Sequence, residues 1–396
     1  MTEHEGPHLL TNVTVHSTAE PYAEAMIVED GLVSWVGSEE TAGRLRDERF
    51  LIEDAEAALA TPAFFGWLRR HAQSSAKDLI DALNQAAQRG IGTVRVVFTG
   101  FSPDDLKNTA ALLQAVEEHP LSVHPVLELD ALQCGDSTSG ERLTEAAAQL
   151  EKQYSGPPLA IGLPAEVWDG DAAAETIGPF AAAAAQAAQQ LVLCLPQATE
   201  PSVVVETVLT VRRGLLDLGS STPPADRPTV LYGFDAADLH VWESLIGAGV
   251  HVVLIGEGHL ALALRAGVPT SVAPAEGHEP WSVVSAYVHR EEDPVSVRAA
   301  FNAQVRGAHR MVSGLPAGHL NPGSAATYAL WEVDSLAVQT PDSRTAAWST
   351  DARARTPLLP YLDGETLPRH LRTVVNGIGV SAAASASTTE APERLS

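Results

Sequence analysis

The strongest constraint on the fold is a regular alternation of helical and strand patterns between Ala76 and Ala273. Apolar residues at helical spacing, such as Leu79, Ile80 and Leu83, are followed by short β-branched runs such as Thr93–Phe98. The first pattern marks an amphipathic helix and the second a buried strand. Their repetition predicts a parallel α/β fold, for which a closed barrel is the economical arrangement at this number of units. An open doubly wound sheet is the alternative.

The two ends of the chain carry a different pattern of short strands. Leu9–Val15, Ala25–Glu29 and Leu32–Val36 read as strands, with a tight turn at Asp30-Gly31. The N-terminal strands and Thr327–Val338 are each too small to bury a core alone. We therefore expect both ends to form one sheet unit.

Composition excludes several classes of function. The chain has 396 residues, 45% of them hydrophobic, with 25 basic and 50 acidic residues, a net charge of −25. Such a charge repels phosphate backbones and anionic lipids, so binding to nucleic acid or membranes is disfavoured. No apolar run reaches the roughly 20 residues that span a bilayer, and Cys134 and Cys194 are too few for a disulfide framework. We expect a cytoplasmic protein.

Three motifs carry a family resemblance: the hairpin AMIVEDGLVSWVG, the turn Thr61-Pro62-Ala63-Phe64, and the segment Gly318–Ala326 before TYALWEVD. In this order they resemble the amidohydrolase superfamily, particularly its amidohydrolase-3 branch. The resemblance implies a TIM-like (β/α) barrel at 61–314 and a small composite β-sandwich built from 1–60 plus 315–380. The low-complexity tail 381–396 is expected to be disordered.

The resemblance also implies metal-dependent hydrolysis of C–N bonds, with metal ligands at the ends of several barrel strands. Laid on this sequence, the ligand positions are occupied by Leu68, Arg70, Pro196, Gly233 and Ala275. Leucine has no donor atom and arginine repels a cation. We therefore expect no cofactor and a non-catalytic binding, scaffolding or regulatory role. Expected partners are a small-molecule ligand, a second copy of the chain or a related active subunit.

The alternative is an active hydrolase with a relocated or partial site for zinc or another divalent metal. Glu257, His259, Glu276 and His278 follow successive strands and are the candidate ligands. His71, Glu166 and Tyr232 are further pocket candidates, and Arg70 is also a candidate for anion binding. If Leu68 and Arg70 face the barrel axis, Arg70 should pair with Glu166, Asp235, Glu276 or a bound anion.

Overall fold

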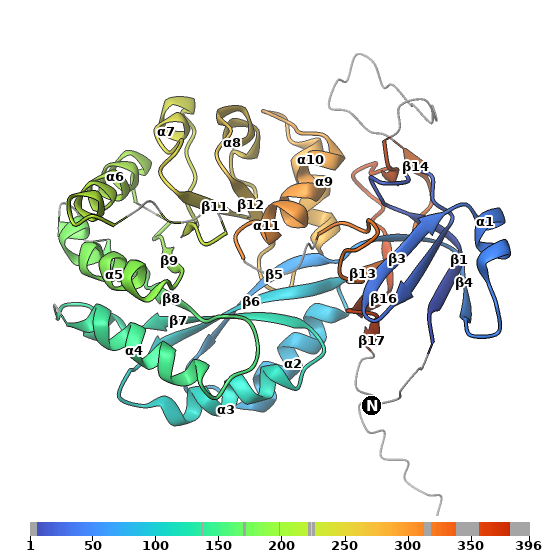
Figure 1. Ribbon diagram of the computed structural model, residues 1–396. Coiled ribbons are helices and arrows are strands. Elements are labelled where there is room, and N and C mark those ends of the chain that lie inside the picture. The colour runs from blue at the N-terminus through green and yellow to red at the C-terminus, as the bar shows by residue number, and fades with distance from the viewer. Residues whose placement is uncertain are drawn as a thin grey trace, which may run out of the picture.

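The computed structural model describes residues 6–136, 138–168, 172–197, 199–220, 223, 226–312, 318–337 and 356–380. Its larger unit is an eight-stranded parallel sheet in which the strands follow one another in chain order. The strands are β5 (Phe64–His71), β6 (Ile91–Phe101), β7 (Ser122–Leu129), β8 (Ala160–Leu163), β9 (Leu191–Cys194), β10 (Thr229–Tyr232), β11 (Val250–Ile255) and β12 (Thr270–Ala273). The first and last strands lie next to each other, so the sheet forms a nearly closed barrel and not an open sheet (Figure 1).

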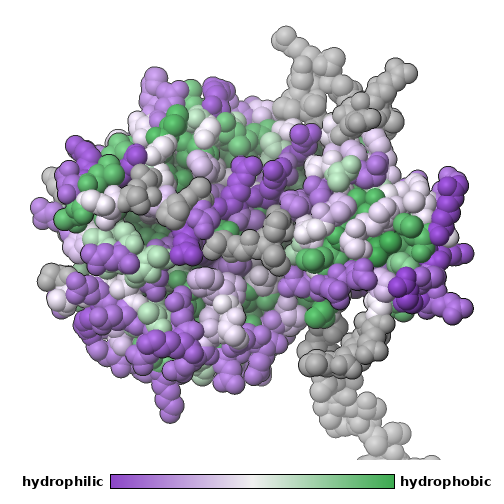
Figure 2. Space-filling model, in the orientation of Figure 1, coloured by the Kyte–Doolittle hydropathy of each residue, from purple (hydrophilic) through white to green (hydrophobic). Residues whose placement is uncertain are grey.

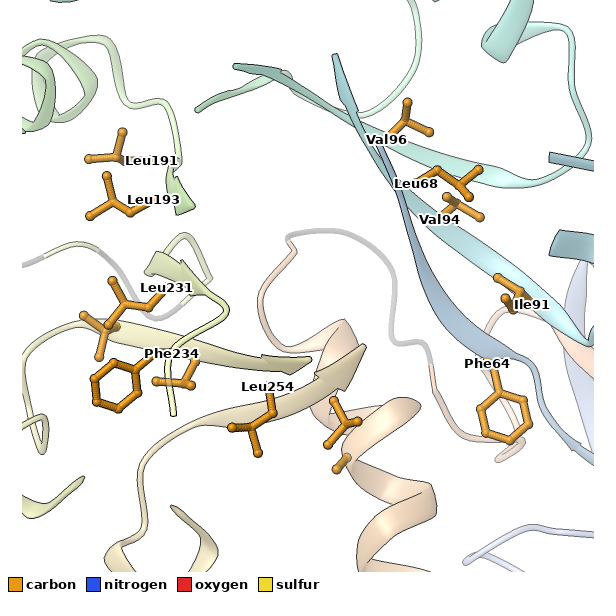
Figure 3. Packing of buried hydrophobic residues seen from close by; sticks show 14 of the residues in the cluster. Phe64, Leu68, Ile91, Val94, Val96, Leu191, Leu193, Leu231, Phe234 and Leu254 are labelled. Atoms are coloured by element: carbon orange, nitrogen blue, oxygen red, sulfur yellow. The ribbon is translucent and has the colours of Figure 1, made fainter. Parts of the chain in front are cut away.

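Helices cover the outside of this barrel (Figure 1). They are α2 (Ala76–Ala87), α3 (Leu106–Glu117), α4 (Ser139–Glu151), α5 (Ala173–Ala187), α6 (Pro201–Asp217), α7 (Leu239–Glu243), α8 (Leu260–Ala266), α9 (Pro280–His289) and α10 (Val297–Gln304), with 3-10 turns at Ala131–Gln133 and Ala165–Val167. The apolar stripe of α2 is buried in the same cluster as Leu68 and Val94, which lie on the outer faces of β5 and β6 (Figure 3). Burial of one apolar stripe against the strands is what stabilises such a helix.

The sequence predicts one long helix over 295–312, and this is wrong. The helix breaks at Val305, whose φ of −115° and ψ of −92° are not helical, and a short helix α11 (Arg306–His309) follows. The break allows Ala308 and Met311 to join Phe65, Val126 and other inward residues in a separate cluster inside the barrel. The bend is therefore the means by which this segment closes the N-terminal end of the barrel.

The smaller unit is a seven-stranded sheet in the order β17-β16-β13-β4-β1-β2-β3 (Figure 1). It consists of β1 (His8–Val15), β2 (Ala25–Glu29), β3 (Leu32–Gly37), β4 (Leu51–Pro62), β13 (Tyr328–Glu332), β16 (Arg369–Val375) and β17 (Ile378–Val380). Helix α1 (Glu39–Leu45) and a two-stranded sheet of β14 (Leu336–Ala337) and β15 (Leu359–Pro360) accompany it. Because β13 from the C-terminal part pairs with β4 from the N-terminal part, the expectation that both ends form one sheet is confirmed. The tail 381–396 lies outside the described residues.

Aromatic packing joins the two units. Trp331 of β13 donates from Nε1 to Thr61 Oγ1 at 2.9 Å and meets Phe64 of β5 edge to face. Gly90, with a φ of 77°, ends the turn after α2, and a Cβ at this position would lie 2.3 Å from the Trp331 ring. Glycine is required here for two reasons: it adopts the left-handed backbone conformation without strain, and it leaves room for the Trp331 ring.

Polar residues cover most of the face seen in Figure 2, with smaller hydrophobic areas over the barrel helices and the sheet. Within the described ranges, no helix is long and apolar enough to cross a membrane.

Candidate functional site

The register of β5 decides which side chains reach the barrel axis. Phe65 and Trp67 belong to the cluster inside the barrel, whereas Leu68 belongs to the outer cluster under the helices (Figure 3). Because side chains alternate along a strand, Arg69 faces the axis and Arg70 shares the outer face with Leu68. The condition set from the sequence, that Leu68 and Arg70 face the axis together, is therefore not met, and the register differs from it by one residue.

Three polar side chains meet at the C-terminal ends of the barrel strands, and we call them the mouth cluster: Arg69 of β5, Glu128 of β7 and Cys194 of β9. Arg69 Nη2 lies 2.7 Å from Glu128 Oε1, and Arg69 Nη1 lies 3.1 Å from Cys194 Sγ. Cys194 Sγ in turn donates to Glu128 Oε2 at 2.9 Å. Glu128 is 3% exposed and Arg69 is 38% exposed, so the guanidinium separates a buried carboxylate from solvent.

The protonation states of the mouth cluster follow from burial and proximity. Burial raises the pKa of the Cys194 thiol, and the neighbouring Glu128 carboxylate raises it further. Burial lowers the pKa of Arg69, but Cys194 and Glu128 outweigh this effect, and the pKa is raised overall. At neutral pH the cluster therefore contains a protonated thiol and a guanidinium paired with a carboxylate.

Three aromatic side chains, Trp67, Trp168 and Tyr232, lie beside the mouth cluster. The rings of Trp67 and Tyr232 have their centroids 4.5 Å apart, and Trp168 donates from Nε1 to the Cys194 carbonyl at 2.9 Å. Burial, with Cys194 as the next contribution, raises the pKa of Tyr232 to about 12, so its hydroxyl is protonated at neutral pH. Tyr232 is a pocket candidate from the sequence. It lies near Arg69, Glu128 and Cys194, none of which was a candidate.

Arg70 pairs with one of the three carboxylates predicted for it. Its Nη2 lies 2.6 Å from Glu276 Oε1 and its Nη1 lies 3.0 Å from Glu276 Oε2. The pair links the end of β5 to the loop after β12, across the seam where the barrel closes. Beside it, a cavity of about 340 Å³ lies outside the barrel wall, lined by Leu68, Val94, Glu276 and His278 among others.

The remaining sequence candidates are dispersed. His259 pairs through Nδ1 with Asp235 Oδ2 at 2.8 Å, while Glu166 and Glu257 are exposed and His71 accepts from the Gln73 backbone at 3.1 Å. In the part of the chain that the structure describes, no three His, Cys, Asp or Glu side chains are placed to hold a metal ion together. Pro196, Gly233 and Ala275 lie just beyond the ends of β9, β10 and β12.

Comparison with solved structures identifies the fold. The chain aligns with triazine hydrolase from Arthrobacter aurescens over 95% of its own length and 94% of that chain, with a TM-score of 0.66 and 17% identity. N-isopropylammelide isopropylaminohydrolase from Burkholderia multivorans gives a TM-score of 0.66 and 15% identity over 95% and 98% of the two chains. This chain has the amidohydrolase fold. Guanine deaminase from E. coli shares it, with a TM-score of 0.60 and 14% identity over 95% and 97%. No family model and no curated protein matches the sequence.

One amidohydrolase-fold structure in this group is an atrazine chlorohydrolase complexed with zinc, so the fit of a metal to the mouth can be tested on the donor set. Zinc in proteins takes three or four neutral imidazole, thiolate or carboxylate donors. Here positions facing the axis hold Trp67, Arg69 and Tyr232, and the carboxylate of the mouth cluster, Glu128, is already paired with a guanidinium. A permanent cation at hydrogen-bond distance from the thiol and carboxylate repels a second cation, so these residues do not fit a divalent metal.

A signal for the mouth cluster exists in the sequence. Glu128 stands in the run SVHPVLEL and Cys194 at the end of LVLC, and each is the residue with an ionisable side chain nearest the end of a buried strand. A charged residue inside a buried strand is costly unless it is paired, which marks Glu128 as a candidate. That Arg69 is its partner can be known only from the register of the barrel strands.

Proposed function

We propose that this protein is a small-molecule-binding member of the amidohydrolase fold that does not hydrolyse C–N bonds by the metal-dependent route. The observation that carries the proposal is the mouth cluster, in which Arg69 holds the Glu128 carboxylate that a metal would need. Metal-assisted hydrolysis requires an ion that lowers the pKa of bound water. A guanidinium supplies positive charge at the same place but has no open coordination position for water.

The side chains that remain suit binding. Arg69 is partly exposed and keeps N–H groups near the solvent side of the cluster, and the Tyr232 hydroxyl, protonated at neutral pH, lies beside it. These groups can donate hydrogen bonds to a ligand that enters from the loops at the C-terminal ends of the strands, where barrel sites form. Scaffolding of a related active subunit is compatible with the same arrangement.

The test is metal analysis of the full chain, purified without chelators from cells grown with zinc, iron and manganese, combined with thermal unfolding in the presence and absence of Zn²⁺. We expect metal well below one equivalent and no Zn²⁺-dependent rise in Tm. Hydrolysis of guanine and of substituted triazines should stay at the level of a no-protein control, with and without added metal.

A stoichiometric metal that is lost in Glu128→Gln would contradict the proposal, because it would place the metal at the mouth cluster. Turnover of either substrate that disappears on chelation would contradict it as well. His240→Gln removes an exposed histidine on α7 and is the control for metal held at the surface.

A further inference from the structure

A second charged group is buried in the barrel, at the opposite end from the mouth cluster. Arg95 of β6 is 2% exposed, and its Nη2 donates to Gln190 Oε1 at 2.6 Å. Its Nε and Nη1 have no hydrogen-bond partner. The Trp67 ring lies 5.7 Å from the guanidinium carbon and covers one side of it.

No carboxylate in the described part of the chain forms an ion pair with Arg95. Burial alone lowers its pKa to about 9, which still leaves it charged at neutral pH. Gln190 cannot neutralise it, because an amide oxygen is uncharged. The Gln190 side chain is held in this position because its Nε2 donates to the carbonyls of Pro228 at 2.9 Å and Met311 at 2.7 Å. Burying an ionised group without a counter-charge is costly, so this arrangement calls for an anion.

Arg95 lines a cavity of about 260 Å³ at the N-terminal ends of the strands. Arg227 also lines it, donates from Nη1 to the Ala188 carbonyl at 2.6 Å, and has its Nε 3.9 Å from Asp226 Oδ2, an ion pair within the cavity wall. His124 lines the same cavity, and burial, together with the nearby Arg95, lowers its pKa to about 3, so it is neutral. Among the described residues, the cavity thus has one guanidinium without an ion-pair partner, that of Arg95, and a second, that of Arg227, which is partly exposed and paired with Asp226.

Other lining residues restrict the kind of anion. Pro158, Leu159 and Ala160 form an apolar part of the wall, whereas Glu151 and Asp226 contribute carboxylates. A ligand with one negative charge and a short apolar body satisfies Arg95 and the apolar wall. A second negative charge would be repelled by the two carboxylates and by the net charge of −25.

We propose that this cavity binds a small organic monocarboxylate, with its carboxylate paired to Arg95 and its carbon skeleton against Pro158 and Leu159. The site is separate from the mouth cluster and does not depend on the function proposed for it. Ligands of barrel proteins ordinarily bind at the other end of the strands, so occupation here gives the protein a binding site distinct from the position of the amidohydrolase active site.

The experiment is calorimetric titration of the full chain with acetate, propionate, butyrate and benzoate at constant ionic strength, with succinate and inorganic phosphate for comparison. We expect saturable binding of at least one monocarboxylate and weaker binding of succinate and phosphate. Arg95→Met should reduce the affinity by about tenfold or more, the usual effect of removing a charged partner. The same variant should unfold at a higher Tm than the wild type without ligand, since it no longer buries an unpaired charge.

Glu151→Gln keeps the oxygen that accepts from the Leu159 backbone at 2.8 Å and removes a rim charge, so it should tighten binding by about twofold to fivefold. A misfolded variant cannot produce this gain. Arg213→Met, on the exposed face of α6, is the matched control and should leave the affinity unchanged. Absence of saturable binding by all four monocarboxylates would overturn the proposal. Equal binding by wild type and Arg95→Met, or tighter binding of phosphate than of any monocarboxylate, would also overturn it.

Discussion

Arg69 is the residue that decides whether the mouth cluster can bind a metal. Its Nη1 and Nη2 lie at 3.1 and 2.7 Å from the thiol and carboxylate, so its replacement leaves both groups facing the same volume. We expect Arg69→His to create a weak divalent-metal site from the introduced imidazole, Glu128 and Cys194, since a histidine, a carboxylate and a thiolate form an accepted zinc donor set. The measurement is the Zn²⁺-dependent change in Tm, absent from the wild type and present in this variant.

Arg70→His is the matched control at the residue scale, because it places an imidazole one position along the same strand but on the outer face. It should break the pair with Glu276 and gain no Zn²⁺-dependent stabilisation. If Zn²⁺ stabilised both variants equally, the added histidine would not need to face the barrel axis, and the predicted site with Glu128 and Cys194 would be contradicted.

The start of α8 shows how one side chain can fix an element. Asp235, in the loop after β10, accepts from the His259 backbone N–H at 2.8 Å through Oδ1 and contacts His259 Nδ1 at 2.8 Å through Oδ2. Asp235→Ala should lower the free energy of unfolding by about 1–2 kcal/mol, the usual cost of losing a helix-terminal acceptor. Urea unfolding measures this. Asp235→Asn keeps an oxygen for the backbone bond, so it should lose less stability. An equal loss in both variants would assign the effect to the contact with the His259 side chain.

At the scale of the whole molecule, buried neutral histidines make the fold sensitive to acid. Burial lowers the pKa of His16 and His309 to about 4 and of His124 and His251 to about 3. Below the unfolded value of about 6.5 the unfolded chain takes up protons that the folded chain does not, so stability falls as the pH drops toward 4. Each group contributes a slope of up to about 1.4 kcal/mol per pH unit in this window.

Urea midpoints between pH 7.5 and 5 test this expectation. In His251→Gln the slope should decrease by the contribution of one proton, because the variant has no group to protonate at that position beside Ser271. His240→Gln, at an exposed site on α7, should leave the slope unchanged. A stability that rises as the pH falls to 5 would show that relief of repulsion among the acidic residues outweighs the histidines.

The sequence by itself predicted the alternation of helices and strands, because hydrophobic periodicity acts locally and can be read in one dimension. It also predicted that the two chain ends form one sheet, because neither is large enough to bury a core alone. Only the tertiary structure decided that the parallel sheet closes into a barrel and does not stay open. The sequence also showed that the end of the first barrel strand is basic, and it predicted that Arg70, if it faced the axis, would pair with an acid or a bound anion. What it could not determine was the register of that strand: FFGWLRRH has apolar residues on both faces, so a shift of one residue is not penalised by the pattern. Only the tertiary structure decided that Arg69 faces the axis and meets Glu128 and Cys194, which lie 59 and 125 residues away along the chain. It likewise decided that Arg95 is buried and that no acid in the described ranges forms an ion pair with it, because the presence or absence of a partner depends on every neighbouring strand at once.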